Sequence, residues 1–79
     1  MNIYKTKFRA KCPADGQVIE YSLLVRAKTM ILAETILKEV DCIQSGYHED
    51  IADRLFASLG AEIILSASHQ GVSIVAVRK

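Results

Sequence analysis

The 79-residue sequence contains no tryptophan, one proline, two cysteines and four glycines. Two cysteines are too few for a disulfide framework, so we expect Cys12 and Cys42 to be reduced thiols in a cytoplasmic protein. No glycine opens a Gly-rich run before a helix, which excludes a phosphate-binding loop and gives no reason to expect a cofactor. The longest uncharged run, Ile63 to Val77, is interrupted by serine, histidine, glutamine and glycine, so it does not have the composition of a membrane span.

What the sequence does contain is typical of a globular protein. Apolar residues make up 51% of the chain, and the formal net charge is +1. The length predicts a single compact domain over residues 1–79, which buries only about 60% of the surface that its unfolded chain exposes. No apolar signal-peptide core precedes the first strand-like stretch, which also favours a cytoplasmic protein.

The N-terminal third predicts a β-hairpin. Residues Ile3 to Cys12 alternate between apolar and charged, as in a half-buried strand. The charged side is a row of four cations: Lys5, Lys7, Arg9 and Lys11. Pro13 to Gly16 predicts the turn and Gln17 to Ala27 the second strand. The resulting register places Ala10 opposite Ile19, Phe8 opposite Tyr21, Tyr4 opposite Val25, and Arg9 opposite Glu20.

The middle of the chain predicts two amphipathic helices, Met30 to Ile43 and Tyr47 to Leu59, joined at Gln44-Ser45-Gly46. Thr29 is the expected N-cap of the first helix, and Gly46 its stop. Ser45 or Gly46 is the expected N-cap of the second helix, and Gly60 its stop. The expected core-facing residues are Met30, Ala33, Ile36, Leu37, Val40 and Ile43 in the first helix, and Ile51, Ala52, Leu55, Phe56 and Leu59 in the second.

The C-terminal part predicts a second hairpin, with strands Ala61 to Ser68 and Val72 to Arg78 around His69-Gln70-Gly71. Both strands are apolar on both faces, so we expect them to be central or covered on both sides. The order ββααββ predicts an α+β fold, in which one four-stranded antiparallel sheet is covered on one face by two short helices. The strand order stays open, although placing the first strand beside the last would bury the C-terminal strand.

The residue types that bind metals or act as nucleophiles are few. Cys12, Cys42, His48 and His69 match the ligand spacing of no zinc module, so we expect no metal site. His48 falls beside the apolar face of its helix, which indicates a packed or boundary histidine. His69 falls in a turn and is expected to be solvent-exposed. Cys42 and His48 are close enough along the chain for a Cys-His nucleophile, but no oxyanion loop or catalytic signature accompanies them.

Charge is segregated along the chain. Residues 1–28 hold six cations and two acids (+4), whereas residues 29–59 hold two cations and six acids (−4). These balances predict a basic patch on or beside the sheet and an acidic helix layer. The candidate partner-binding residues are the cations Lys5, Lys7, Arg9, Lys11, Arg26 and Lys28, with a second candidate surface at Glu49, Asp50 and Asp53. Lysines on a strand can also simply keep a sheet edge soluble.

Three functions are compatible with these features. The first is a non-enzymatic protein-interaction module, a monomer or small homo-oligomer that uses its charged faces without a membrane. The second is a small, non-specific nucleic-acid-binding protein, which would bind phosphates in a salt-dependent way. Base stacking is disfavoured because the strand aromatics share the face opposite the lysines. The third is a small enzyme that uses Cys42 and His48. We favour the first because it requires only surfaces.

The small size, the lack of a catalytic motif, and the two hairpins and two helices with Lys5, Lys7, Arg9 and Lys11 in a row give the sequence a resemblance to a known class. It resembles the small inhibitor proteins that phages encode against bacterial defence systems, such as anti-CRISPR proteins. The resemblance implies a non-enzymatic inhibitor in the cytoplasm of a bacterial host. Such an inhibitor would dock on a CRISPR-type nucleoprotein complex and block its DNA binding or nuclease recruitment.

Overall fold

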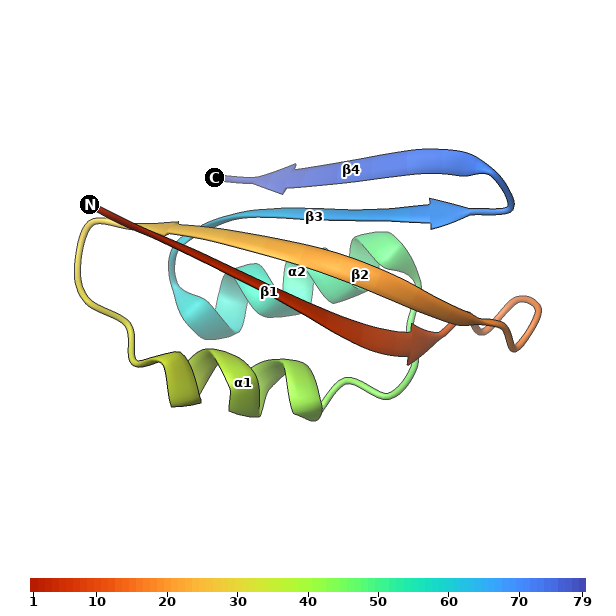
Figure 1. The fold of residues 1–79 in the computed structure, drawn as a ribbon, viewed down its shortest axis with the longest axis horizontal. Helices are drawn as coiled ribbons and strands as arrows, with labels where there is room; N and C mark the ends of the chain where they lie inside the picture. The colour runs from red at the N-terminus through yellow and green to blue at the C-terminus, as the bar shows by residue number, and fades with distance from the viewer.

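The computed structural model describes residues 1–79 as one sheet and two helices in the order ββααββ (Figure 1). The strands are β1 (Asn2–Lys11), β2 (Val18–Ala27), β3 (Glu62–His69) and β4 (Val72–Arg78), and the helices are α1 (Ala33–Asp41) and α2 (His48–Leu59). The sheet order is β1-β2-β3-β4, and every neighbouring pair is antiparallel. The predicted α+β fold is therefore confirmed. Neither helix has the length and apolar composition that crossing a membrane requires.

The register of the first hairpin is also confirmed. The pairs along β1 and β2 include Phe8 with Tyr21 and Arg9 with Glu20, together with the other predicted pairs, Ala10 with Ile19 and Tyr4 with Val25. The aromatic rings of Phe8 and Tyr21 stack with centroids 5.2 Å apart on the side that faces the helices. The loop length gave this register and the alternation agrees with it, because a slip of one residue would turn every lysine of β1 into the core.

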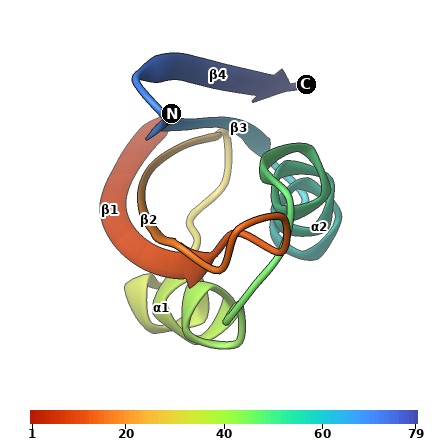
Figure 2. The same cartoon turned by 90° about the vertical axis from the view of Figure 1, so that its right-hand side faces the viewer.

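The sheet curves around the core, and the two helices cover the inner, concave side of the sheet (Figure 2). The central side chains of β2 and β3 meet those of α2 there, and the largest fully buried side chains are Tyr21, Leu23, Leu55, Ile63, Leu65 and Val25. Ile36 and Val40 bring α1 into the same cluster. Each helix is amphipathic and short, so it depends on this packing for its stability.

The position of β4 differs from the expectation. β1 and β4 form the two opposite edges of the sheet, so they do not pair with each other. One face of β4 contributes Ala76 to the core, whereas Val72, Val75 and Val77 on the strand are exposed. The prediction of a covered C-terminal strand is therefore wrong for β4 and correct for β3, which lies inside the sheet.

Helix α1 begins three residues later than predicted. Met30 is exposed and precedes the helix, and Leu32 is the N-cap in an extended conformation, without a side-chain cap. The segment before the helix is attached to β1, because the Ile31 N–H donates to the Tyr4 hydroxyl at 3.0 Å. The proposed cap at Thr29 is therefore wrong. Ala33 and Leu37 are exposed as well, so the buried stripe of α1 is narrower than predicted.

The connection between the helices is held against the edge of β1. The Lys11 N–H donates to the Gln44 carbonyl at 2.9 Å, and the Gly46 N–H donates to the Lys11 carbonyl at 3.1 Å. These bonds form a short parallel bridge between Lys11 and Ser45. The first helix stops before it, at Asp41 with Cys42 as its C-cap, so Gly46 is not its stop. Tyr47, not Ser45 or Gly46, is the N-cap of α2, whereas Gly60 ends α2 in the left-handed conformation, as predicted.

Candidate binding surface on the open sheet face

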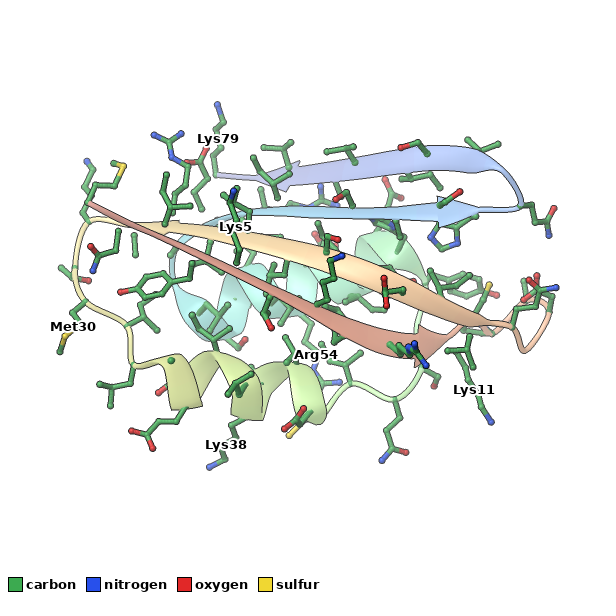
Figure 3. All side chains as sticks on the ribbon, in the orientation of Figure 1. Lys5, Lys11, Met30, Lys38, Arg54 and Lys79 are labelled. Carbon is green, nitrogen blue, oxygen red and sulfur yellow. The ribbon has the colours of Figure 1, made fainter.

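One side of the sheet is not covered by the helices, and we call it the open face. Every second side chain of each strand points to this side. On β1 the side chains that point to the open face are the exposed cations Lys5, Lys7, Arg9 and Lys11, so the predicted row lies on this face. Lys11 lies at the C-terminal end of the strand, whereas Lys5 lies between its start and its middle (Figure 3). Arg26 lies on the same face of β2, and Lys28 lies just beyond the end of that strand.

Two of these cations are neutralised by neighbouring acids. Arg9 Nε lies 3.8 Å from Glu20 Oε2, and Arg26 Nη1 lies 3.2 Å from Glu62 Oε2. Such exposed pairs contribute little to stability, but they reduce the charge offered to a partner. The remaining cations of β1, which make no ion pair, are Lys5, Lys7 and Lys11.

The open face changes from charged to apolar across the sheet. Lys5 lies opposite Leu24, Leu24 opposite Ile64, and Ile64 opposite Val77. Val75 and Val77, at the β4 side, are 56% and 43% exposed. A hollow of about 390 Å³ lies between the two halves. Its wall includes Lys5, Lys7, Ser22, Leu24, Ile64 and Ser66.

No aromatic side chain lies on the open face. Tyr4, Phe8 and Tyr21 are on the opposite side of β1 and β2, toward the helices, and Phe8 and Tyr21 are buried. Tyr47 and Phe56 lie at the start of α2 and within it. Single-stranded nucleic acids are usually held by bases stacking on aromatic rings, so this face lacks the side chains for that mode of binding.

The second candidate surface lies on α2. Glu49, Asp50 and Asp53 are exposed, and the first two lie in the first turn, where the helix dipole favours anions. Asp53 is engaged by Arg78, whose Nε donates to Asp53 Oδ1 at 2.7 Å. This hydrogen bond raises the pKa of Arg78. Glu49 and Asp50 make no ion pair, so they are the free part of this acidic surface.

A histidine pair lies at the start of α2, where His48 precedes Glu49, and at the end of β3, where His69 lies. The Nε2 of His48 lies 2.8 Å from the Leu65 carbonyl oxygen, which only accepts, so Nε2 carries the ring proton. His48 Nδ1 is then the acceptor for His69 Nε2–H, 3.1 Å away. Burial lowers the pKa of His48, which favours this neutral arrangement.

Tyr21 lies against both imidazoles, with ring centroids 5.3 Å from His48 and 5.9 Å from His69. Its hydroxyl is buried and has no hydrogen-bond partner. Burial raises the pKa of Tyr21, and the nearby Cys12 adds to the shift. Cys12 and His69 line a hollow of about 320 Å³ at this end of the molecule.

These contacts correct two predictions. His69 is not a solvent-exposed turn residue, because it ends β3 and its ring is hydrogen-bonded to His48. The Cys42–His48 couple is not formed, since both ring nitrogens of His48 are engaged by Leu65 and His69 while Cys42 is exposed after α1. The packed position predicted for His48 is confirmed. No group of three or more histidine, cysteine, aspartate or glutamate side chains is placed to hold a metal ion.

The apolar half of the open face was missed by the sequence reasoning. The signal was present, because Ile64, Val75 and Val77 alternate with core residues along β3 and β4. Because both faces of these strands are apolar, the strands were predicted to be central or covered on both sides. The structure shows instead that Val75 and Val77 of this outer set are exposed to solvent.

Comparison with known proteins bears on the fold. No known protein family matches the sequence, and no curated protein matches it at a significant level. Among solved structures, the chain is similar to the crystal structure of the archaeosine synthase QueF-Like in the apo form, with a TM-score of 0.86 and 19% sequence identity over 98% of this chain and 89% of that chain. At this identity the similarity establishes the fold alone. The chain therefore shares its fold with an enzyme, so the fold gives no argument against catalysis.

Proposed function

We propose that this protein is a non-enzymatic docking module that binds a partner protein, or the protein surface of a nucleoprotein complex, through its open face. The observation that carries the proposal is the composition of that face. Unpaired Lys5 and Lys7 lie beside a hollow that the half-buried Leu24 and Ile64 also line, and the exposed Val75 and Val77 continue the aliphatic surface on β4. Unpaired cations steer an acidic partner toward the face, and the aliphatic residues supply area that is removed from water on contact.

The resemblance in size and architecture to phage-encoded inhibitors suggests a more specific form of this function. In that form the partner is a bacterial CRISPR-type complex, and docking blocks its DNA binding or nuclease recruitment. Purified CRISPR effector complexes and a labelled DNA target test this directly. We expect the protein to reduce target binding or cleavage by a susceptible complex. Failure against a broad panel of complexes would reject the inhibitor form and leave the docking module to be tested by itself.

A pair of matched charge reversals tests the docking module. We expect Lys5→Glu with Lys7→Glu to abolish capture of the partner, whereas Lys38→Glu with Arg54→Glu, the same charge change on the helices, should leave it intact. Capture from lysate is compared with and without nuclease. The proposal is supported if a partner protein is still captured after nuclease treatment and its capture is lost only with the variant that carries Lys5→Glu and Lys7→Glu. Equal loss with both variants would show that only net charge matters.

Nucleic acid is the competing target of the same lysines. A direct nucleic-acid binder would retain affinity for labelled DNA or RNA in the absence of protein. Its log affinity would fall linearly with log salt concentration, with a slope set by the number of phosphates contacted. Fluorescence anisotropy with single- and double-stranded probes measures this. Tight binding of either probe, together with loss of all captured protein after nuclease treatment, would replace the docking proposal by this function.

A catalytic function has one specific support, which is the group formed by Cys12, Tyr21, His48 and His69 in a fold shared with an enzyme. In this group His69 holds the only imidazole nitrogen that is not already hydrogen-bonded, its Nδ1. A nucleophilic role for Cys12 would make its thiol react faster with iodoacetamide than the exposed Cys42. A faster reaction of Cys42 would argue against such activation.

A further inference from the structure

The edge of β1 is unpaired over most of its length. Lys11 directs both its N–H and its C=O away from β2, toward Gln44 and Gly46. Backbone groups of alternate residues in an antiparallel strand point to the same side, so those of Ile3, Lys5, Lys7 and Arg9 also face outward. None of these residues makes a backbone hydrogen bond outside the sheet ladder. At about 3.3 Å per residue, this free edge is roughly 20 Å long.

Two hollows follow this edge between β1 and α1. One, of about 170 Å³, is lined by Tyr4, Thr6, Ile36 and Leu37 among others. The other, of about 420 Å³, lies farther along β1 and is lined by residues that include Phe8, Val40 and Ile43. Leu37 is 50% exposed, although it belongs to a helix that packs on the sheet. The space beside the edge is therefore partly apolar and is not filled by the chain itself.

We propose that this edge accepts an extended segment of the partner as a fifth strand, in which acidic residues alternate with aliphatic ones. The inference rests on the proposed docking function and specifies how the partner is held. In an added strand, one set of side chains would lie beside the unpaired Lys5 and Lys7 on the open face, where acids are favoured as cross-strand neighbours. The other set would point toward α1 and enter the two hollows, where aliphatic side chains fit.

The bridge at Lys11 supports this arrangement. Gln44 to Gly46 already occupies the last position of the edge as a one-residue parallel strand. The edge is therefore shaped to accept backbone hydrogen bonds, and the partner segment would continue the row that Ser45 begins. Strand addition of this kind takes its affinity from main-chain hydrogen bonds and its specificity from alternate side chains.

A second copy of this chain fits the edge poorly. Pairing two β1 edges would place the cations of one strand against those of the other, which is destabilising. The β4 edge offers Ser73, Val75 and Val77 on its open face and no acid. Neither edge strand of the protein carries an acid that could lie beside Lys5 and Lys7, so charge complementarity assigns the segment to a different protein.

The test uses the purified protein and an acetylated, amidated and fluorescently labelled peptide of seven alternating valine and glutamate residues. A peptide of the same composition, with the glutamates adjacent to one another, is the matched control. We expect the alternating peptide to bind at low salt at least about tenfold more tightly than the control, because only alternation places every glutamate on the lysine side and every valine toward α1. Binding should weaken as salt is added.

Amide hydrogen exchange locates the bound peptide. In the free protein the amides of Lys5, Lys7 and Arg9 face solvent and should exchange quickly, whereas those of Thr6 and Phe8 lie in the ladder and should be protected. We expect the alternating peptide to slow exchange at the three outward amides. Protection that appears instead along β4, or nowhere on either edge, would overturn strand addition.

Lys7→Pro tests the same contact by mutation, and Lys7→Gln is its control. Both variants remove the charge, but only proline removes the outward N–H, and neither removes a ladder hydrogen bond. We expect Lys7→Pro to weaken peptide binding about tenfold beyond Lys7→Gln. Equal binding by the two variants refutes the proposal. A Lys7→Pro protein that does not fold, as judged by its thermal transition, leaves the decision to the exchange experiment on the wild-type protein.

The two peptides also separate this inference from the docking function on which it rests. If both peptides bind equally and both are lost with the Lys5→Glu and Lys7→Glu variant, docking on the open face stands and strand addition is rejected. If neither peptide binds at low salt, an acidic partner for this surface is rejected as well. An increase in the protein's own mass in solution at micromolar concentration would assign the edge to a second copy instead.

Discussion

Replacing Leu55 by alanine should remove a large part of the stability of this fold. A chain of 79 residues has a free energy of unfolding of roughly 4–12 kcal/mol, at about 0.05–0.15 kcal/mol per residue. The Leu55 side chain is fully buried between α2 and the sheet. Truncating such a leucine costs about 2–5 kcal/mol, because the lost burial is followed by a cavity that closes only in part. The thermal midpoint should then fall by roughly 8 °C or more.

Leu37→Ala is the matched control, because it removes the same atoms from a position that is 50% exposed. Each buried methylene contributes about 0.8 kcal/mol, so the loss of three half-buried groups should cost only about 1 kcal/mol. Ile36→Ala, on the buried side of α1, should resemble Leu55→Ala, and Glu34→Ala should be nearly silent. Urea denaturation followed by circular dichroism measures all four. Equal losses at Leu37 and Leu55 would refute the assignment of the core-facing side of α1.

Three further predictions concern the titrating and charged groups. Burial lowers the pKa of His48 in the folded state, so the contribution of His48 to stability is present above the unfolded-state pKa of about 6.5 and is lost as the pH falls through the lowered value. The urea midpoints at pH 7.5 and 5.5 should therefore differ less in His48→Gln than in the wild-type protein. Equal differences in the two proteins would contradict this prediction. Replacing Cys12 and Cys42 together by alanine should leave partner capture unchanged, and loss of function in a variant that melts normally would indicate a thiol-dependent activity. The affinity for a protein partner should fall with salt through its association rate, and a purely dissociation-controlled salt effect in stopped-flow measurements would argue against steering by Lys5 and Lys7.

The parts of the fold that follow from local pattern could be predicted. The first hairpin is the clearest case, since Lys5 to Lys11 place a charge at every second residue and the four-residue turn then gives the register that buries Phe8 and Tyr21. The turn at Gln70-Gly71, where both residues adopt positive φ values of 51° and 84°, is likewise a short-range feature with a recognisable glycine. Such elements can be assigned because residues within one hairpin decide them.

The remaining features depend on partners that are distant in the sequence. The segment that precedes α1 is attached to β1 by Tyr4, whose hydroxyl accepts the N–H of a residue 27 positions away. His48 and His69 lie 21 positions apart, and nothing near either residue indicates their hydrogen bond. The open face could be predicted only in half, since a row of lysines is visible in one strand whereas the aliphatic half requires knowledge that β4 has no neighbour beyond it.

The strand order, in which each strand pairs only with its neighbours in the chain, has a consequence for how fast the protein folds. Both hairpins can form from local contacts, on the microsecond scale typical of such units. Joining them requires β2 to meet β3, which closes the whole segment from Lys28 to Ala61 with both helices inside it. That closure is the step of greatest sequence separation, and loop-closure entropy grows only slowly with length. Insertions in the connection between α1 and α2 should therefore slow folding little, whereas variants at the β2–β3 contact should slow it most.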